Sequence, residues 1–139
     1  MAAGEVFADT PALYALIDRR DGNHPAIRAA VERVVKAGRF LVMTDYIVAE
    51  TVNLANARGG RLVANRVLDL IEQSAGIRME WIGVERFTRT KAFFRKHSDH
   101  NYSFTDCTSF IVMKEERISE VLTTDAHFRE AGFKVLPAT

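Results

Sequence analysis

The chain has 139 residues, of which 47% are hydrophobic and 27% are charged. This size and balance are typical of one compact globular unit, so we expect a single domain over residues 1–139. The formal net charge of +1 excludes a strongly basic coat for nucleic acid, although a local basic patch remains compatible with it. Cys107 is the only cysteine, which excludes an intrachain disulfide and a thiolate-rich zinc site.

The sequence shows no feature that would direct the protein to a membrane or out of the cell. No apolar run approaches the length of a membrane span. Residues 1–5 have neither the basic region nor the apolar region of a signal peptide. A lone cysteine also fits a reducing compartment. We therefore expect a cytoplasmic protein with no membrane partner.

The first predicted elements are a buried strand and a helix. The apolar residues 6–8 form the strand, and Asp9, Thr10 and Pro11 follow it as a helix start. A second helix is predicted over residues 24–37, with Pro25 in its first turn and Gly38 just beyond its end.

The middle of the chain is predicted to contain two strands and three helices. Residues 40–43 form a strand, and Thr44 caps a helix that runs to about Arg58. The pair Gly59-Gly60 ends that helix, and another follows over residues 61–74. Residues 79–82 are predicted to form a short strand, with Trp81 in the core, and residues 85–96 a helix.

The last third is predicted to alternate in the same way. A polar loop covers residues 97–102, and a helix runs from Ser103 to about Glu116. A strand over residues 121–123, a short helix over residues 126–131 and a final strand over residues 134–136 complete the chain. Strands that alternate with helices pair in parallel, and continuous apolar strands are covered on both faces. The predicted fold class is α/β, a three-layer α/β/α sandwich with a mainly parallel central sheet.

Two aspartates follow predicted strands directly. Asp9 comes after the first strand, and Asp125 comes after the strand over residues 121–123. In open parallel sheets, functional sites lie at the carboxyl ends of the strands, so both side chains belong at that edge. The alternative is that each aspartate only caps the helix that follows it.

Two further acids lie on helices with apolar surroundings. The neighbours of Glu50 at helical spacing form a largely apolar face, so we expect Glu50 to be buried with a partner, rather than on a solvated face. Asp106 opens a helix that is apolar nearly all round, so it needs a charged or hydrogen-bonding partner. Residues 103–106 also fit a capping box, and the two roles are compatible.

The four acids together suggest a metal site. Clustered carboxylates repel one another unless protons or a cation neutralise them. Oxygen ligands without histidine or cysteine favour Mg²⁺ or Mn²⁺ over zinc. One or two such ions would activate water and stabilise the oxyanions of an attack on a phosphodiester.

At these acids the sequence resembles the PIN-domain family and, within it, the VapC-type toxins. The matching stretches span nearly the whole chain and are residues 6–10, 44–50, 102–107 and 122–128. The resemblance implies that the metal-binding acids are Asp9, Glu50, Asp106 and Asp125. It further implies a metal-dependent endoribonuclease that forms a homodimer and is inhibited by a cognate antitoxin. Thr10 and Thr124 would support the acids.

Other functions remain open at this point. The chain could be a non-toxin PIN nuclease, or a module on the same fold that binds RNA or protein without catalysis. A phosphotransfer receiver or phosphatase-like domain also places acids at strand ends. A receiver would need a lysine after a late strand, whereas Lys134 begins the final strand. The position of Glu50 within a helix also argues against it.

Three surfaces are ambiguous from the sequence. The basic residues around Lys91 and Arg95 either contact RNA phosphates or form a solvated helix face. Tyr102 either stacks on a base or packs in the core, and His100 is either a general acid or only exposed. Two predicted helices carry more apolar surface than a small monomer easily hides, so we expect part of it at a dimer interface. The residues concerned are Ala12, Leu13, Leu16, Ile17, Val63, Val67 and Leu70.

Overall fold

The computed structural model describes residues 4–137, in which five parallel strands form one sheet. The strands are β1 (Val6–Ala8), β2 (Leu41–Thr44), β3 (Ile77–Glu80), β4 (Glu120–Leu122) and β5 (Lys134–Leu136), in the spatial order β3-β2-β1-β4-β5. Residues 1–3, which belong to the segment expected to carry no signal peptide, and residues 138–139 lie outside the described part. One domain over residues 1–139 therefore stays a prediction.

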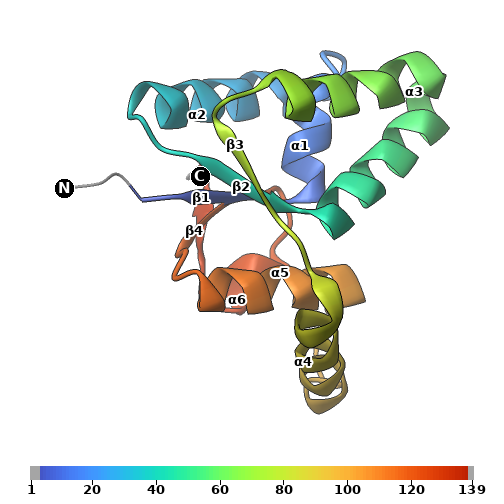
Figure 1. Ribbon diagram of the computed structural model, residues 1–139. Coiled ribbons are helices and arrows are strands. Elements are labelled where there is room, and N and C mark those ends of the chain that lie inside the picture. The colour runs from blue at the N-terminus through green and yellow to red at the C-terminus, as the bar shows by residue number, and fades with distance from the viewer. Residues whose placement is uncertain (1–3, 138–139) are drawn as a thin grey trace.

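Helices cover both faces of the sheet (Figure 1). On one face lie α1 (Thr10–Ile17), α2 (His24–Lys36) and α3 (Asp45–Gln73). On the other lie α4 (Gly83–Lys96), α5 (Phe104–Glu115) and α6 (His127–Glu130), with α4 outermost. The predicted three-layer α/β/α sandwich with a parallel sheet is confirmed.

The central strands have no solvent-facing side, as their continuous apolar sequence predicts. Every residue of β1 and β2 is buried, and the side chain of Phe7 is fully inaccessible. The core continues through Phe110 of α5 and Phe128 of α6 on one face, and through Ile27 of α2 on the other. Burial of each such side chain contributes about 1.5–3 kcal/mol, which is how the helices are held against the sheet.

The direction of the chain across the sheet reverses at β1. From β1 the chain proceeds outward through β2 and β3, whereas β4 and β5 lie on the opposite side of β1. The loops that leave β1 and β4 therefore diverge, and they leave a crevice at the carboxyl ends of these two strands. Asp9 and Asp125 both lie in those loops.

The predicted break at Gly59-Gly60 is a sharp kink within α3. Gly60 has φ 79° and ψ −174°, a conformation that is essentially restricted to glycine. A Cβ on Gly59 would lie 2.5 Å from the side chain of Val63, so a side chain there would collide with the next turn. The two halves of α3 correspond to the two predicted helices.

The predicted strand over residues 79–82 was placed two residues too late. Pairing with β2 sets β3 at Ile77–Glu80, with Leu41 opposite Ile77. Trp81 lies beyond the strand with 68% of its surface exposed, so its predicted place in the core is wrong. Ile82 is buried instead, and its N–H donates to Asp45 Oδ1 at 2.9 Å.

Of the seven apolar residues expected to supply a dimer surface, Leu16, Ile17, Val63 and Leu70 are partly exposed, and the other three are hidden within the monomer. Ala12, Leu13 and Val67 are buried within the monomer because α1 and α3 pack against each other and the sheet. The large apolar side chains of α3 that are exposed are Leu62 and Leu68. Among residues 4–137, no helix combines the length and the apolar character that crossing a membrane requires.

Candidate metal centre

An acidic pocket of about 510 Å³ opens at the crevice between β1 and β4. All four acids singled out in the sequence line it, namely Asp9, Glu50, Asp106 and Asp125, together with Asp21. They come from four separate segments: the loops after β1 and β4, the first half of α3 and the start of α5. The fold thus brings together residues that are far apart in the sequence.

Asp9 is held at the bottom of this crevice. Its N–H donates to the carbonyl of Leu122, which extends the pairing of β1 with β4 by one residue. Its carboxylate makes no capping hydrogen bond to α1, so the helix-cap alternative does not account for it. Only 3% of Asp9 is exposed, and this burial, with Asp106 and Asp125 nearby, raises the pKa of its carboxyl group to about 7.

Asp106 has the hydrogen-bonding partners that were expected for an acid at the start of an apolar helix. Ser103 Oγ accepts from the N–H of Asp106 at 2.9 Å, and Asp106 Oδ2 accepts from the N–H of Ser103 at 3.1 Å. This completes the predicted capping box. Asp106 Oδ2 also accepts a 2.9 Å hydrogen bond from His127 Nδ1. The structural and site-facing roles therefore coexist in one carboxylate.

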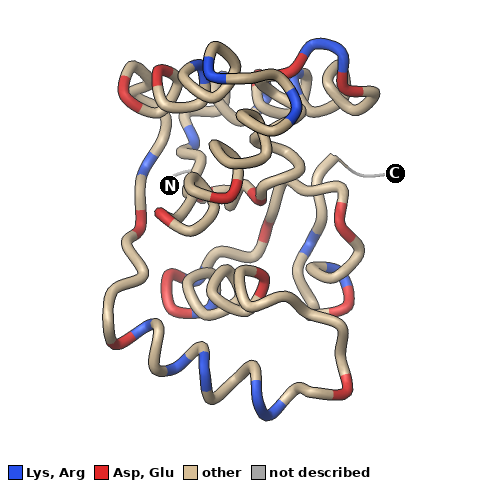
Figure 2. Tube along the Cα trace, turned by 90° about the vertical axis from the view of Figure 1, so that its right-hand side faces the viewer, with Lys and Arg blue, Asp and Glu red and all other residues tan. Residues whose placement is uncertain are grey.

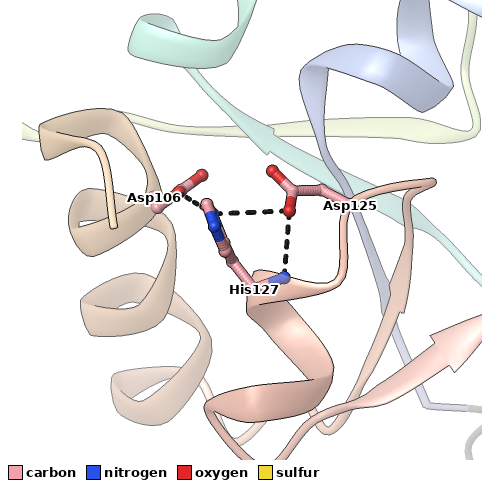
Figure 3. A group of neighbouring side chains, drawn as sticks. All are labelled: Asp106, Asp125 and His127. Carbon is pink, nitrogen blue, oxygen red and sulfur yellow. Dashed lines mark hydrogen bonds and ion pairs between the residues drawn. The ribbon is translucent and has the colours of Figure 1, made fainter. Parts of the chain in front are cut away.

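His127 connects Asp106 to Asp125 (Figure 3). Its ring Nδ1 lies 3.4 Å from Asp125 Oδ1, and that oxygen accepts the backbone N–H of His127 at 2.9 Å. Asp125 therefore bonds to the backbone at the start of α6, although the N-cap of this helix is Ala126 and not Asp125, as the cap alternative had supposed. The hydrogen bond to Asp106, followed by the nearby carboxylates, raises the pKa of the His127 imidazole.

Glu50 differs from its predicted environment. It is exposed, because the core-facing side of α3 is formed by Ile47, Thr51 and Ala55 and Glu50 points into the open pocket. The expectation of a buried glutamate was therefore wrong, although its predicted place beside the other acids is where it lies. An exposed carboxylate on a rigid helix can approach a ligand without a large desolvation cost.

Arg58 is the only Lys or Arg among the pocket-lining residues that the structure describes. Its guanidinium lies 5.0 Å from the centre of the Tyr14 ring, a cation–π contact. Tyr14 is itself fixed, because its hydroxyl donates a 2.6 Å hydrogen bond to Asp18. The pocket therefore combines a floor of carboxylates with one positioned cation.

Comparison with known proteins agrees with this architecture. The family model for the PIN domain matches residues 6–134. The chain belongs to the PIN-domain family. It is also 30% identical over 129 residues to the 23S rRNA-specific endonuclease VapC20 of Mycobacterium tuberculosis, an alignment that covers 92% of this chain and 95% of that protein.

Three solved structures resemble the fold described here. The crystal structure of M. tuberculosis VapC20, a sarcin–ricin loop cleaving toxin, superposes with a TM-score of 0.82 at 26% identity, covering 93% of this chain and 96% of that one. FitAcB from Neisseria gonorrhoeae gives a TM-score of 0.63 at 16% identity and covers 94% and 95%. VapBC2 from Rickettsia felis, bound to a promoter DNA fragment, gives 0.66 at 7% and covers 94% and 96%. At these identities the last two support the fold alone.

The cluster of this PIN domain that could hold a metal includes a residue that sequence reasoning had not assigned. Ligand atoms of Asp106, Asp125 and His127 all lie within 4.8 Å of one another. A histidine two residues after a strand-end aspartate is a signal in the sequence, but its approach to Asp106, 21 positions earlier, depends on packing of α6 against α5. Cys107 is buried, as predicted, and burial raises the pKa of its thiol to about 11, so it is no nucleophile.

Proposed function

We propose that the protein is a Mg²⁺- or Mn²⁺-dependent endoribonuclease and the toxin of a VapBC-type toxin–antitoxin pair. The observation that carries this proposal is the convergence of Asp9, Glu50, Asp106 and Asp125 on one pocket of a PIN domain. Similarity to an endonuclease specific for 23S rRNA supports RNA as the substrate. Ribosomal RNA is therefore the first substrate to test.

The residues present fit a divalent metal ion. Four carboxylates offer hard oxygen donors of the kind that Mg²⁺ and Mn²⁺ prefer. Thr10 Oγ1, in a residue that lines the same pocket, is buried and has no hydrogen-bond partner among residues 4–137, so it could bond to a metal-bound water. His127 Nδ1 donates to Asp106, so in this proposal His127 orients that carboxylate and the oxygen donors form the ligand set. When bound, the ion would activate water and neutralise charge on the phosphate that is attacked.

The remaining residues would orient the site and the substrate. Thr123 donates to Asp9 and fixes one carboxylate oxygen, and His127 does the same for Asp106. Hydrogen bonds of this kind around metal ligands set their direction and basicity. Arg58 stands at the wall of the pocket and would contact a phosphate oxygen of the RNA strand.

An antitoxin would bind to the carboxylates of the acidic pocket and to an exposed apolar surface on α4. A pocket of carboxylates accepts the planar fork of an arginine, which would exclude both metal and RNA. Trp81, Val84, Phe87 and Phe94 form an exposed apolar stripe that begins just before α4 and runs along it. We propose that a flexible antitoxin segment packs on this stripe and inserts an arginine into the acidic pocket.

A homodimer is the remaining part of this proposal. Leu62 and Leu68 on the second half of α3 are 68% and 39% exposed. Exposure of apolar side chains to water is unfavourable, and packing against a second copy of the chain would bury them. Leu62→Asp combined with Leu68→Asp should shift the protein from dimer to monomer in analytical ultracentrifugation. A wild-type chain that sediments as a monomer at micromolar concentration would remove the dimer from the proposal.

The nuclease proposal is tested by cleavage of ribosomal RNA with and without metal. Cleavage should require Mg²⁺ or Mn²⁺ and should stop in excess chelator. Asp106→Asn should keep the fold and lose most activity, because a neutral amide binds these cations poorly. Asp69→Asn is the matched control, since Asp69 is an exposed acid of α3 outside the pocket. Undiminished cleavage in chelator would refute the metal-dependent mechanism.

The toxin proposal needs a separate experiment in cells. Expression of the chain alone should arrest bacterial growth, and co-expression of the neighbouring gene should relieve the arrest. Asp9→Ala should be harmless. A soluble wild-type chain that cleaves RNA but does not affect growth would indicate a non-toxin PIN nuclease. Binding of RNA without cleavage would indicate the non-catalytic alternative.

A further inference from the structure

A second pocket of about 460 Å³ lies beside the acidic one, where α4 ends and the loop over residues 97–102 leads to α5. Its volume lies within the range of about 300–1,000 Å³ that is usual for small-ligand sites. Asn101 lines both pockets, so they adjoin each other at this residue. The metal-centre proposal uses none of the other residues of the second pocket.

The wall of this second pocket is built from stacked rings. His100 lies on Tyr102 with ring centres 4.7 Å apart and planes that differ by 3°. Tyr102 is only 8% exposed and meets the ring of Phe110 edge-on at 5.0 Å, so the core holds it in place. The side chain of His100 is 40% exposed. A ring supported by the core on one side thus presents an accessible face on the other.

The charge of this pocket differs from that of its acidic neighbour. Arg95 lines it, and no carboxylate does among residues 4–137. Arg86 and Arg89 of the same helix are paired with Glu115, but Arg95 has no ion pair within the described residues. Figure 2 shows basic positions recurring along α4, the helix at the bottom of that view. An aromatic platform with a free cation beside it is suited to a nucleotide.

We propose that the second pocket binds one unpaired nucleobase of the RNA strand next to the scissile phosphate, stacked on the exposed face of His100. Arg95 contacts the phosphate of that nucleotide. The substrate is then RNA in which a base beside the cut is extruded from the helix or lies in a loop, because a paired base cannot enter a pocket of this kind. This inference rests on the proposed ribonuclease function.

The ring arrangement also connects the base to the acidic pocket. Tyr102 meets the ring of His127 edge-on at 5.6 Å, and His127 donates to Asp106. A base stacked on His100 is therefore linked to the carboxylate of Asp106 through a continuous chain of contacts, from His100 to Tyr102 to His127. Occupation of the second pocket positions the neighbouring phosphate at the acids, which makes His100 a specificity-determining residue rather than a catalytic one.

The test combines removal of the ring with removal of the base. RNA substrates identical except for one abasic nucleotide at successive positions around the cut are cleaved by the wild type. One position should lower kcat/KM about tenfold, the effect expected for loss of a stacked base. His100→Ala should show the same loss on intact RNA and no further loss on the abasic substrate. His100→Phe, which keeps a flat ring, should retain wild-type discrimination.

Lys96→Ala is the matched control, because Lys96 is an exposed residue just before the same loop that does not line the pocket and makes no ion pair with His100 among the described residues. It should alter cleavage of intact and abasic RNA by the same factor. If His100→Ala also lowers both by the same factor, or lowers neither, the base-binding proposal is overturned. A general defect in folding would act equally on the two substrates and would not imitate the expected result.

A second measurement separates this inference from the proposed function. The four nucleoside 5′-monophosphates are titrated into metal-free protein, and the ring-proton signals of His100 and Tyr102 are followed by NMR. Shifts that saturate in the wild type and vanish in His100→Ala support the pocket even if no RNA is cleaved. Signals that do not move with any of the four nucleotides overturn the proposal, whether or not the protein is a nuclease.

Discussion

Thr123 Oγ1 donates a 2.9 Å hydrogen bond to Asp9 Oδ2, across 114 positions of sequence. Thr123 Oγ1 itself accepts the backbone N–H of Asp125 at 3.0 Å. One buried hydroxyl thus ties the acid after β1 to the acid after β4, at the place where the direction of the sheet reverses. The spacing of the two carboxylates is therefore a property of the sheet itself.

Asp9→Asn should stabilise the metal-free protein above neutral pH. The folded-state pKa of Asp9 is raised from 3.8 to about 7, so between these values the folded protein holds a proton that the unfolded chain releases. Its contribution to the free energy of unfolding therefore falls as pH rises from about 4 to about 7, by roughly 2–4 kcal/mol. The amide should remove this dependence, as measured by urea unfolding in chelator at pH 5 and pH 8.

A bound metal ion should offset the loss of stability that deprotonation of Asp9 causes at higher pH. Mn²⁺ takes the place of the proton, so it should raise the unfolding midpoint of the wild type more at pH 8 than at pH 5. Asp69→Asn serves as the control and should leave both effects unchanged. A wild type whose metal-free stability increases between pH 5 and pH 8, relative to Asp9→Asn, would contradict the burial argument.

Glu50→Gln should separate activity from stability. Glu50 is exposed and has no hydrogen bond within the described residues, so the thermal midpoint should stay within about 1 °C, as is usual for a surface change. Cleavage should fall at least about tenfold because an anionic donor is lost. Differential scanning calorimetry and RNA cleavage measure the two effects. A large loss of stability with intact activity would assign Glu50 a purely structural role.

His127→Ala should weaken the response to metal, since Asp106 loses the group that orients it. The metal concentration for half-maximal cleavage should rise about 10- to 100-fold. His127→Asn places an amide N–H near the position of Nδ1 and should recover much of this loss. If both variants lower only the thermal midpoint and leave the metal dependence unchanged, His127 only supports the fold.

Arg58→Ala should raise the KM for RNA about tenfold and change kcat little, as expected for one charge-assisted phosphate contact. The slope of log affinity against log salt should also decrease by about one. Arg61→Ala is the control, because Arg61 is also exposed, on the other side of the kink, but does not line the pocket. Equal effects of the two variants would point to general electrostatic attraction instead.

The alternation of apolar runs with helix signals was enough to predict the fold. Runs such as residues 6–8 are apolar at every position, because strands covered on both faces have no solvated side. Local chemistry also identified the capping box at Ser103 and the break at Gly60, since each depends on neighbouring residues alone. The boundaries of β3 were missed because its register is set by pairing with β2.

The sequence also identified the four acids, because a carboxylate after a strand or on an apolar helix is conspicuous without any knowledge of packing. What only the tertiary structure decided is how they are surrounded. Glu50 is exposed, Asp9 is buried beside Thr123, and His127 reaches Asp106. Such pairings depend on the order of strands and on how α5 and α6 pack together, and no local pattern encodes contacts across so many positions.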